Sequence, residues 1–334
     1  DWRAGYGPIA HRSETIERMQ ALVQRLVAQR RIADEASAHA LLAAADRVAC
    51  TAMSVVAHMT YARRIDRSGC PLGSDDFKQT PEGHTGGSLN MVPAFVGYLL
   101  ANALTGTTRG WLMGQGHCVA AIEAVNALTG DVSAAQRGRY DRSEAGLSRL
   151  IADFYSYAID KQGRPAVPLG SHAGPNTAGA ISEGGYLGFA GLQYVHTPLP
   201  GESLVAFLSD GAFEEQRGSD WAPRWWRAED CGFAIPVMIL NGRRIEQRTQ
   251  IVQEGGATWL AEDLRHNGFD PVIVDGRDPM AIAWAIVEAE DTLSAFAARS
   301  DRRYPVKLPY VIAETEKGFG FPGAATNAAH NLPL

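Results

Sequence analysis

The chain has 334 residues, of which 46% are hydrophobic and 20% charged, an ordinary composition for a soluble globular protein. This composition excludes disordered, collagen-like and disulfide-scaffold proteins. The 31 Lys and Arg residues against 37 Asp and Glu give a net charge of −6, which argues against a nucleic-acid partner because phosphate backbones bind concentrated positive faces. We therefore expect a small-molecule ligand.

Cysteine usage and hydropathy predict a cytoplasmic protein without a membrane span. The four cysteines lie far apart and form no Cys-x-x-Cys pair, so we expect neither a zinc site nor a secreted disulfide framework. The longest uncharged apolar run, Met91 to Leu104, is shorter than the roughly 20 residues that cross a bilayer. The chain begins at Asp1 without a charged-then-apolar leader, and we expect its natural start to lie upstream.

The first part of the chain is predicted to be helical. Glu14 to Met59 is rich in Ala, Leu, Arg and Glu, and its apolar residues recur at helical spacing, which predicts two or three helices. Asp66 to Gly87 is rich in Gly, Pro, Ser and Asp and predicts a long loop, which at this length is functional or disordered. We expect residues 1–65 to form a helical segment packed on a main domain of residues 66–334.

The main domain is predicted to be a three-layer α/β fold with a mostly parallel sheet. Short apolar runs alternate with amphipathic segments, and such alternation gives a parallel sheet covered by helices on both faces. Ligands of such folds bind outside the carboxyl ends of the strands. The predicted strands are Trp111 to Met113, Leu204 to Leu208, Pro236 to Leu240, Pro271 to Val274 and Tyr310 to Ala313. The predicted helices are Leu89 to Ala103, Val119 to Leu128, Gly185 to Val195, Ser219 to Ala228 and Pro279 to Arg299.

Polar residues follow two consecutive predicted strands and indicate a metal site. Asp210 and Gly211 follow the strand ending at Leu208, and Asn241 follows the strand ending at Leu240. The spacing of 31 positions suits one helical crossover, which would bring Asp210 and Asn241 to the same sheet edge. With a main-chain carbonyl near Arg243 they offer hard oxygen ligands suited to Mg²⁺. Alternatively, the two segments are simple turns at strand ends.

Glycine-rich segments with histidines indicate a site for a diphosphate. Gly83 to Gly87 contains His84, and Gly114 to His117 follows a predicted strand. Glycines let main-chain N–H groups approach an anion, and each segment opens a helix whose amino end favours negative charge. A third cluster, Ser171 to Gly179, leads into Ile181 to Gly188, whose composition predicts a glycine-rich helix start that lies close against something planar or charged. The alternatives are that these histidines are turn residues and that the glycines serve tight helix packing.

These motifs together resemble those of the thiamine-diphosphate enzymes, and among them the amino-terminal half of the phosphoketolases. The superfamily's Gly-Asp-Gly…Asn motif corresponds to Ser209-Asp210-Gly211…Asn241, with Ser in place of the first Gly. The more specific match is Ser171 to Gly188, which follows the phosphoketolase pattern almost residue for residue. Further counterparts are Leu240-Asn241-Gly242, Gly83-His84, Gly116-His117 and Ala329-His330-Asn331-Leu332-Pro333-Leu334. The resemblance covers roughly Lys78 to the carboxyl terminus.

The resemblance implies the cofactors thiamine diphosphate and Mg²⁺. The implied metal ligands are Asp210, Asn241 and the carbonyl of Arg243, and the implied cofactor-binding residues are Gly116, His117, Gly185, Leu187, Asp210, Gly211 and Asn241. The implied catalytic residues around the reactive carbon of the cofactor are His84, His117, His172 and His330. Histidine suits this role because cleavage beside a carbonyl needs proton transfers near neutral pH. Glu183, Glu214 and Glu215 either join a carboxylate network in the site or are solvated.

The implied activity is cleavage of a ketose phosphate, such as xylulose 5-phosphate or fructose 6-phosphate, with inorganic phosphate to give acetyl phosphate and an aldose phosphate. The alternatives are a transketolase-like transfer of a two-carbon unit, another ketose-phosphate rearrangement, and a non-catalytic partner subunit that binds cofactor. The sequence departs from the phosphoketolase pattern in the short segment after His84, at Tyr186 in place of an acid and at Asn331 in place of Gln. Because these positions are near the substrate, cofactor binding is the firmer expectation.

The family builds its site between two domains, and only one is recognisable here. The pyrimidine-binding domain, which supplies the glutamate that activates the cofactor, is expected from a carboxyl-terminal region beyond Leu334 or from another subunit. The family pairs these domains across a dimer, so the resemblance also implies a homodimer.

Overall fold

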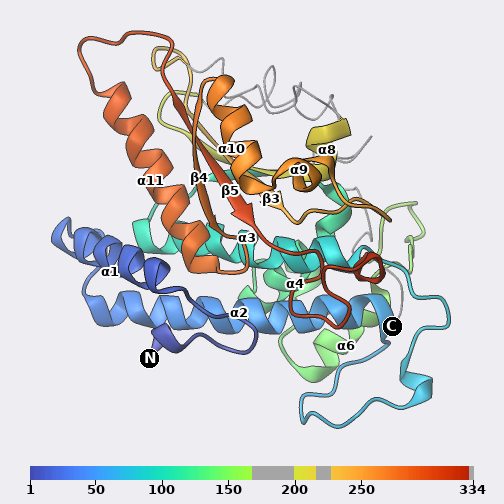
Figure 1. The fold of residues 1–334 in the computed structure, drawn as a ribbon. Helices are drawn as coiled ribbons and strands as arrows, with labels where there is room; N and C mark the ends of the chain where they lie inside the picture. The colour runs from blue at the N-terminus through green and yellow to red at the C-terminus, as the bar shows by residue number, and fades with distance from the viewer. Residues whose placement is uncertain (168–198, 216–226, 331–334) are drawn as a thin grey trace.

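The computed structural model describes residues 1–167, 199–215 and 227–330 (Figure 1). Its centre is a five-stranded parallel sheet in the order β1-β2-β3-β5-β4. Each of the five predicted strands is confirmed, and each is longer than predicted, β1 only by Gly110, because its neighbours continue the hydrogen-bond ladder. The strands are β1 (Gly110–Met113), β2 (Ser203–Ser209), β3 (Phe233–Leu240), β4 (Phe269–Asp275) and β5 (Leu308–Glu314).

Helices cover both faces of the sheet, as the predicted three-layer α/β fold requires. In Figure 1, α11 and α10 lie on opposite sides of β4 and β5. Both helices contact those strands, and α11 also packs along α3. The longer helices are α1 (Ser13–Ala28), α2 (Glu35–Tyr61), α3 (Thr85–Thr105), α4 (Val119–Thr129), α6 (Glu144–Asp153), α10 (Ala257–His266) and α11 (Pro279–Ala297). The shorter ones are α5 (Ala134–Arg137), α8 (Asp210–Glu215) and α9 (Gln250–Glu254).

The amino-terminal segment forms two helices, α1 and α2, within the predicted two or three. Helix α1 packs on α11, and α2 packs along α3 and α4, so this segment adds a further layer outside the sheet's own helices. The division of the chain at residue 65 remains a prediction.

The long loop ends earlier than predicted, because α3 begins at Thr85. Gly86 and Gly87, expected in the loop, form the first turn of this helix and are buried. Helices α2 and α3 both have the length and apolar composition of a membrane span. The apolar run Met91 to Leu104 was predicted to be too short to cross a bilayer, but the helix that contains it, α3, is longer than this run. In α3, 83% of the apolar window is buried inside the protein, as in a core helix, and in α2 44% is buried.

Of the longer helices, α6 and α10 were not predicted although their sequences carry the signal, and the short helices α5, α8 and α9 were not predicted either. In α10 the buried residues Ala257, Leu260, Ala261 and Leu264 follow the i, i+3, i+4, i+7 pattern of an amphipathic helix. In α6 the buried residues Leu147, Leu150 and Ile151 follow the same spacing. The predicted helix Gly185 to Val195 lies outside the described residues, and so does nearly all of Ser219 to Ala228.

A buried histidine between two aspartates joins the amino-terminal segment to α2 and α11. His11 Nε2 lies 3.0 Å from Asp46 Oδ2, and His11 Nδ1 lies 3.0 Å from Asp278 Oδ2. Asp278 also caps α11 by accepting a hydrogen bond from Met280 N at 2.8 Å. Burial alone would lower the pKa of His11, but the hydrogen bonds and charges of Asp278 and Asp46 outweigh it and raise the pKa to about 10. His11 is therefore a core cation at neutral pH.

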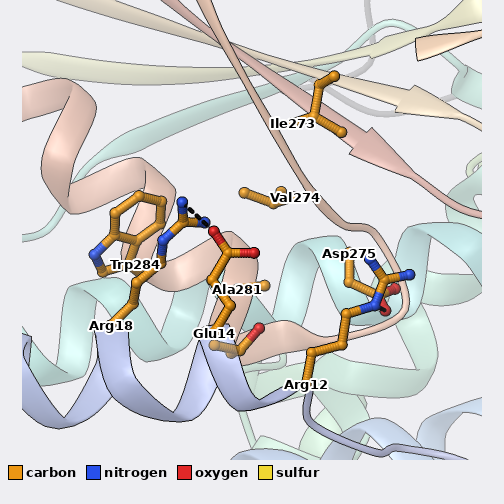
Figure 2. A pocket seen from close by; sticks show the side chains of 9 residues that line it. Arg12, Glu14, Arg18, Ile273, Val274, Asp275, Ala281 and Trp284 are labelled. Atoms are coloured by element: carbon orange, nitrogen blue, oxygen red, sulfur yellow. Dashed lines mark ion pairs between the residues drawn. The ribbon is translucent and has the colours of Figure 1, made fainter. Parts of the chain in front are cut away.

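Next to this group, at the end of β4, lies a pocket of about 40 Å³, shown in Figure 2. Arg12 pairs with Asp275 at 2.9 Å, and Arg18 pairs with Glu14 at 2.5 Å. The Arg18 guanidinium also lies over the Trp284 ring, 4.2 Å from its centroid. The pocket holds a few waters at most, and both of its arginines already have a carboxylate, so it is a packed corner of the fold rather than a ligand site.

His11→Leu is predicted to destabilise the protein by about 3–5 kcal/mol at pH 7, because it leaves two buried carboxylates without their cation. The folded-state pKa of about 10 exceeds the ordinary value of 6.5, so the stabilisation is complete below pH 6.5 and is lost as pH rises through 10. Urea denaturation between pH 6 and 10 measures both effects, with the exposed His266→Leu as control. Equal stability of His11→Leu and wild type at pH 7 would contradict the ion-pair assignment.

Candidate functional site

Asp210 stands where β2 ends and α8 begins, and its side chain is fully buried. Its Oδ1 accepts a hydrogen bond from Gly211 N at 3.0 Å, and its Oδ2 accepts one from Gly242 N at 2.7 Å. Because β2 and β3 are parallel neighbours in register, their carboxyl ends meet at one edge of the sheet. The structure therefore brings the turn that contains Asn241 onto Asp210, as the spacing predicted.

The turn after β3 is shaped by its own polar groups. Asn241 Oδ1 accepts a hydrogen bond from Arg243 N at 3.0 Å, and Gly242 has a φ of 78°, which favours glycine. Gly242 O accepts from Thr249 N at 3.0 Å, and Thr249 Oγ1 lies 3.5 Å from Asp210 Oδ2. The Arg243 side chain donates to Asn327 Oδ1 at 2.5 Å, which joins the turn to the segment before His330.

Burial raises the pKa of Asp210 to about 7. The N–H groups of Gly242 and Gly211 act in the opposite direction, the charge of Glu214 raises the pKa further and Lys317 lowers it. A desolvated carboxylate of this kind gains from a cation.

The charged side chains near Asp210 are too few to bind a hard metal ion by themselves, so amide and main-chain oxygens would have to complete its coordination. Within residues 1–167, 199–215 and 227–330, no group of three or more His, Cys, Asp and Glu side chains could hold a metal. A cation beside Asp210 would therefore take the Asn241 amide oxygen, main-chain carbonyls such as that of Arg243, and oxygens of a bound ligand. This is the donor set that Mg²⁺ accepts.

Three of the four predicted histidines come together at the same end of the sheet. His84 directly precedes α3, His117 lies in the short 3₁₀ helix Gly116–Cys118 after β1, and His330 follows the 3₁₀ helix Asn327–Ala329. The ring centroids of His84 and His117 are 5.0 Å apart, and those of His84 and His330 are 5.3 Å apart. Both ring pairs meet edge to face.

The first turn of α3 allows this approach because it carries glycines. Gly86 N donates to His330 O at 3.1 Å, and a Cβ at Gly86 would lie 1.9 Å from Ala329 O. A Cβ at Gly87 would lie 2.9 Å from Cys118 Sγ and 3.1 Å from His117 Nε2. In this part of the structure the glycines serve close packing of three chain segments.

Gly114 and Gln115 place the 3₁₀ helix of His117 beside the Asp210 strand. Gly114 N donates to Phe207 O at 2.8 Å, and the buried Gln115 side chain donates to Leu208 O at 3.4 Å. Gly116, a predicted cofactor-binding residue, is buried at the start of that helix. The histidine cluster and Asp210 therefore share one edge of the sheet.

Lys317 lies between the two groups, and sequence reasoning missed it. It is 5% exposed, its Nζ donates to Arg244 O at 2.8 Å, and its charge lowers the pKa values of both Asp210 and His330. Burial, Lys317 and His84 together lower the pKa of His330 to about 4, so His330 is neutral at pH 7. The only available signal was its place just after strand β5, where ligand-binding residues of this fold class gather.

The Glu214 side chain is mostly buried near Asp210 rather than exposed to solvent. Its side chain is 9% exposed, its Oε1 accepts from Ile251 N at 2.6 Å, and its Oε2 lies 3.6 Å from Arg244 Nε. Its charge raises the pKa of Asp210. His172, Glu183, Gly185, Tyr186, Leu187 and Asn331 lie outside the described residues, and so does the side chain of Glu215.

Comparison with known proteins gives a family match over most of the chain. The family model described as "XFP N-terminal domain" matches residues 37–329. A probable phosphoketolase from Streptomyces coelicolor is 32% identical over 216 residues, covering 58% of this chain and 25% of the relative. A probable phosphoketolase from Pseudomonas putida is 26% identical over 290 residues, covering 79% of this chain and 35% of the relative. The chain thus spans about a quarter to a third of these relatives.

Among solved structures, a transketolase mutant from Pichia stipitis superposes with a TM-score of 0.47 and 17% sequence identity. The superposition covers 86% of this chain and 38% of that chain.

Gly86→Ala is predicted to lower the free energy of unfolding by about 1–3 kcal/mol and to displace the segment of His330, because the new Cβ would overlap Ala329 O. Gly138→Ala is the matched control, since a Cβ there meets no atom within 4 Å and Gly138 has an ordinary φ of −80°. Urea denaturation measures stability, and hydrogen exchange over residues 317–330 localises the change. Equal behaviour of the two variants would refute the close-packing role of Gly86.

Proposed function

The chain belongs to the XFP N-terminal domain family, and from this premise we propose that it forms the diphosphate-binding part of a thiamine diphosphate- and Mg²⁺-dependent enzyme. The proposed reaction is that of a phosphoketolase, in which a ketose phosphate and inorganic phosphate give acetyl phosphate and an aldose phosphate. The pyrimidine-binding domain comes from a further part of the protein or another subunit. We further propose a cytoplasmic homodimer, as the family resemblance implies.

The observation that carries this proposal is the buried Asp210 carboxylate at the carboxyl end of β2. Two main-chain N–H groups orient its oxygens, and the Asn241 turn is fastened to it through Gly242. Asp210, Asn241 and the carbonyl of Arg243 would hold Mg²⁺, which in turn would neutralise the diphosphate. Gly116, Gly211 and Lys317 would line the same diphosphate, together with Gly185 and Leu187 of the matched motif.

The histidine cluster supplies the proton-transfer groups. When bound, thiamine diphosphate supplies the electron sink for cleavage of the carbon–carbon bond beside a carbonyl. His330, neutral at pH 7, accepts a hydrogen bond or a proton from a substrate hydroxyl. His84 and His117, at 5.0 Å from each other, orient further hydroxyls of the sugar, and His172 completes the proposed set.

Lys317 tunes this arrangement by charge. Burial is the main cause of the low pKa of His330, and Lys317 lowers this pKa further, so that the imidazole remains neutral; Lys317 also favours the ionised form of Asp210. Its positive charge also favours an anionic ligand between the two groups.

Cofactor binding is the first test. In the complete native protein, Asp210→Ala and Asn241→Ala are each predicted to weaken Mg²⁺-dependent thiamine diphosphate binding by more than about 100-fold, because each removes a metal ligand. Calorimetric titration measures this, with Asp270→Ala, an exposed aspartate on edge strand β4, as control. Mg²⁺ affinity should also fall as pH drops below 7, where Asp210 becomes protonated. Unchanged binding in both variants would remove the metal assignment.

Product analysis tests the reaction. With a ketose phosphate, we expect acetyl phosphate to appear only when inorganic phosphate is present, and His330→Ala to slow turnover by about 100-fold or more. Dependence on an aldose acceptor instead would indicate a transketolase-like transfer. Cofactor binding without turnover on either route would indicate a non-catalytic partner subunit.

A further inference from the structure

A second cavity lies at the loop that precedes His84 and α3. Its volume is about 410 Å³, ample for a small phosphorylated molecule. Residues from three parts of the chain line it: Arg63 just after α2, the loop before His84, and the end of α6 with the segment that follows it. The polar and aromatic lining includes Arg63, Lys78, Thr80, Glu82, Tyr155 and Tyr157.

The cavity has an excess of positive charge. Within the described part of the chain, neither Arg63 nor Lys78 forms an ion pair with a carboxylate, and Glu82 is the acidic residue of the lining. Lys78 Nζ donates to Met59 O at 2.6 Å and to Phe154 O at 3.3 Å. Because an ammonium has three protons, Lys78 retains one donor for a ligand. Two cations and one carboxylate favour an anion.

Lys78 is partly desolvated, which strengthens this preference. Burial lowers the pKa of Lys78 to about 8, against the opposing charge of Glu82, so the side chain is still mainly protonated at pH 7. A bound anion would restore the charge compensation that burial has removed. The arginines of the pocket in Figure 2, in contrast, are already neutralised by Asp275 and Glu14.

Tyr155 forms the wall between this cavity and the histidine cluster. A Cβ at Gly83 would lie 3.3 Å from the Tyr155 ring, and the Tyr155 hydroxyl lies beside the backbone of His84. Tyr155 and Tyr157 both have left-handed backbone conformations, with φ values of 62° and 52°. Such conformations are unfavourable for side chains other than glycine and concentrate at functional sites. Here they place two aromatic rings at the cavity.

We propose that this cavity is a subsite for a phosphate group, held by Arg63 and Lys78 next to His84. Tyr155 and Tyr157 provide the flat, hydroxyl-bearing surface that a sugar attached to the phosphate would contact. The same chemistry serves a sugar phosphate or free inorganic phosphate. The place of this subsite in a reaction rests on the function proposed above, but phosphate binding itself does not.

The test uses two exposed charged residues whose replacement leaves the fold's core unchanged. In the complete native protein, without thiamine diphosphate or Mg²⁺, calorimetry measures binding of inorganic phosphate, of a ketose phosphate and of the same ketose without phosphate. Arg63→Ala is expected to weaken phosphate binding by about tenfold, the size of a charge-assisted hydrogen bond. Glu82→Gln is expected to strengthen it several-fold, because it removes a repulsive charge. Arg47→Ala, an exposed arginine on α2 outside the cavity, is expected to change nothing.

The ligands distinguish the two sources of phosphate. Opposite effects of Arg63→Ala and Glu82→Gln on inorganic phosphate assign the subsite to the free anion, and the same effects on the ketose phosphate alone assign it to the substrate's phosphate. The proposal is overturned if no phosphate compound binds, if neither variant changes binding, or if the unphosphorylated ketose responds equally. Absence of thiamine diphosphate binding would remove the proposed function and leave this result intact.

Discussion

The site depends on one buried carboxylate that joins the ends of two strands. Asp210 lies out of water, and its two oxygens accept main-chain hydrogen bonds from its own helix start and from the turn after β3. These bonds fix the turn of Asn241, yet they do not fully offset the loss of hydration, and the pKa of the carboxyl remains near 7. The fold thus holds a carboxylate whose charge it does not fully compensate, and such perturbed groups cluster at functional sites.

The remaining groups are coupled to this carboxylate through Lys317. Its ammonium lowers the pKa values of both Asp210 and His330, and the main chain that follows it contacts the first turn of α3. Gly318 N donates to Gly86 O at 3.3 Å, and Ala325 N donates to Lys317 O at 2.8 Å. The segment after β5 therefore carries Lys317 and His330 as one packed unit, and a shift of that unit would change the charge balance at both ends of the site.

The sheet could be predicted because each strand is marked by its own short stretch of sequence. Each strand is an apolar run, and the alternation with helices leaves few topologies, so the meeting of residues 210 and 241 followed from spacing alone. The start of α3 was not predictable in this way. Gly83 to Gly87 has the composition of a loop, yet α3 begins at Thr85. Gly86 and Gly87 can be helical there because they pack against residues distant in sequence, namely Ala329, Lys317 and Cys118. Lys317 was missed for the same reason, since its place just after β5 does not by itself show that the fold brings it near Asp210 and His330.

Tyr155 and Tyr157, with their left-handed backbone, place a similar limit on sequence reasoning. Nothing in Phe154-Tyr155-Ser156-Tyr157 signals left-handed backbone, yet Tyr155 and Tyr157 adopt it and line a cavity that also contains two cationic side chains. A chain that keeps unfavourable backbone at bulky residues must recover the cost through the packing around them. Lys78, through its bonds to Met59 O and Phe154 O, ties the end of α2 to this segment and supplies part of that packing. The same ammonium therefore holds the segment that carries Tyr155 against the end of α2 and also contributes positive charge to the cavity.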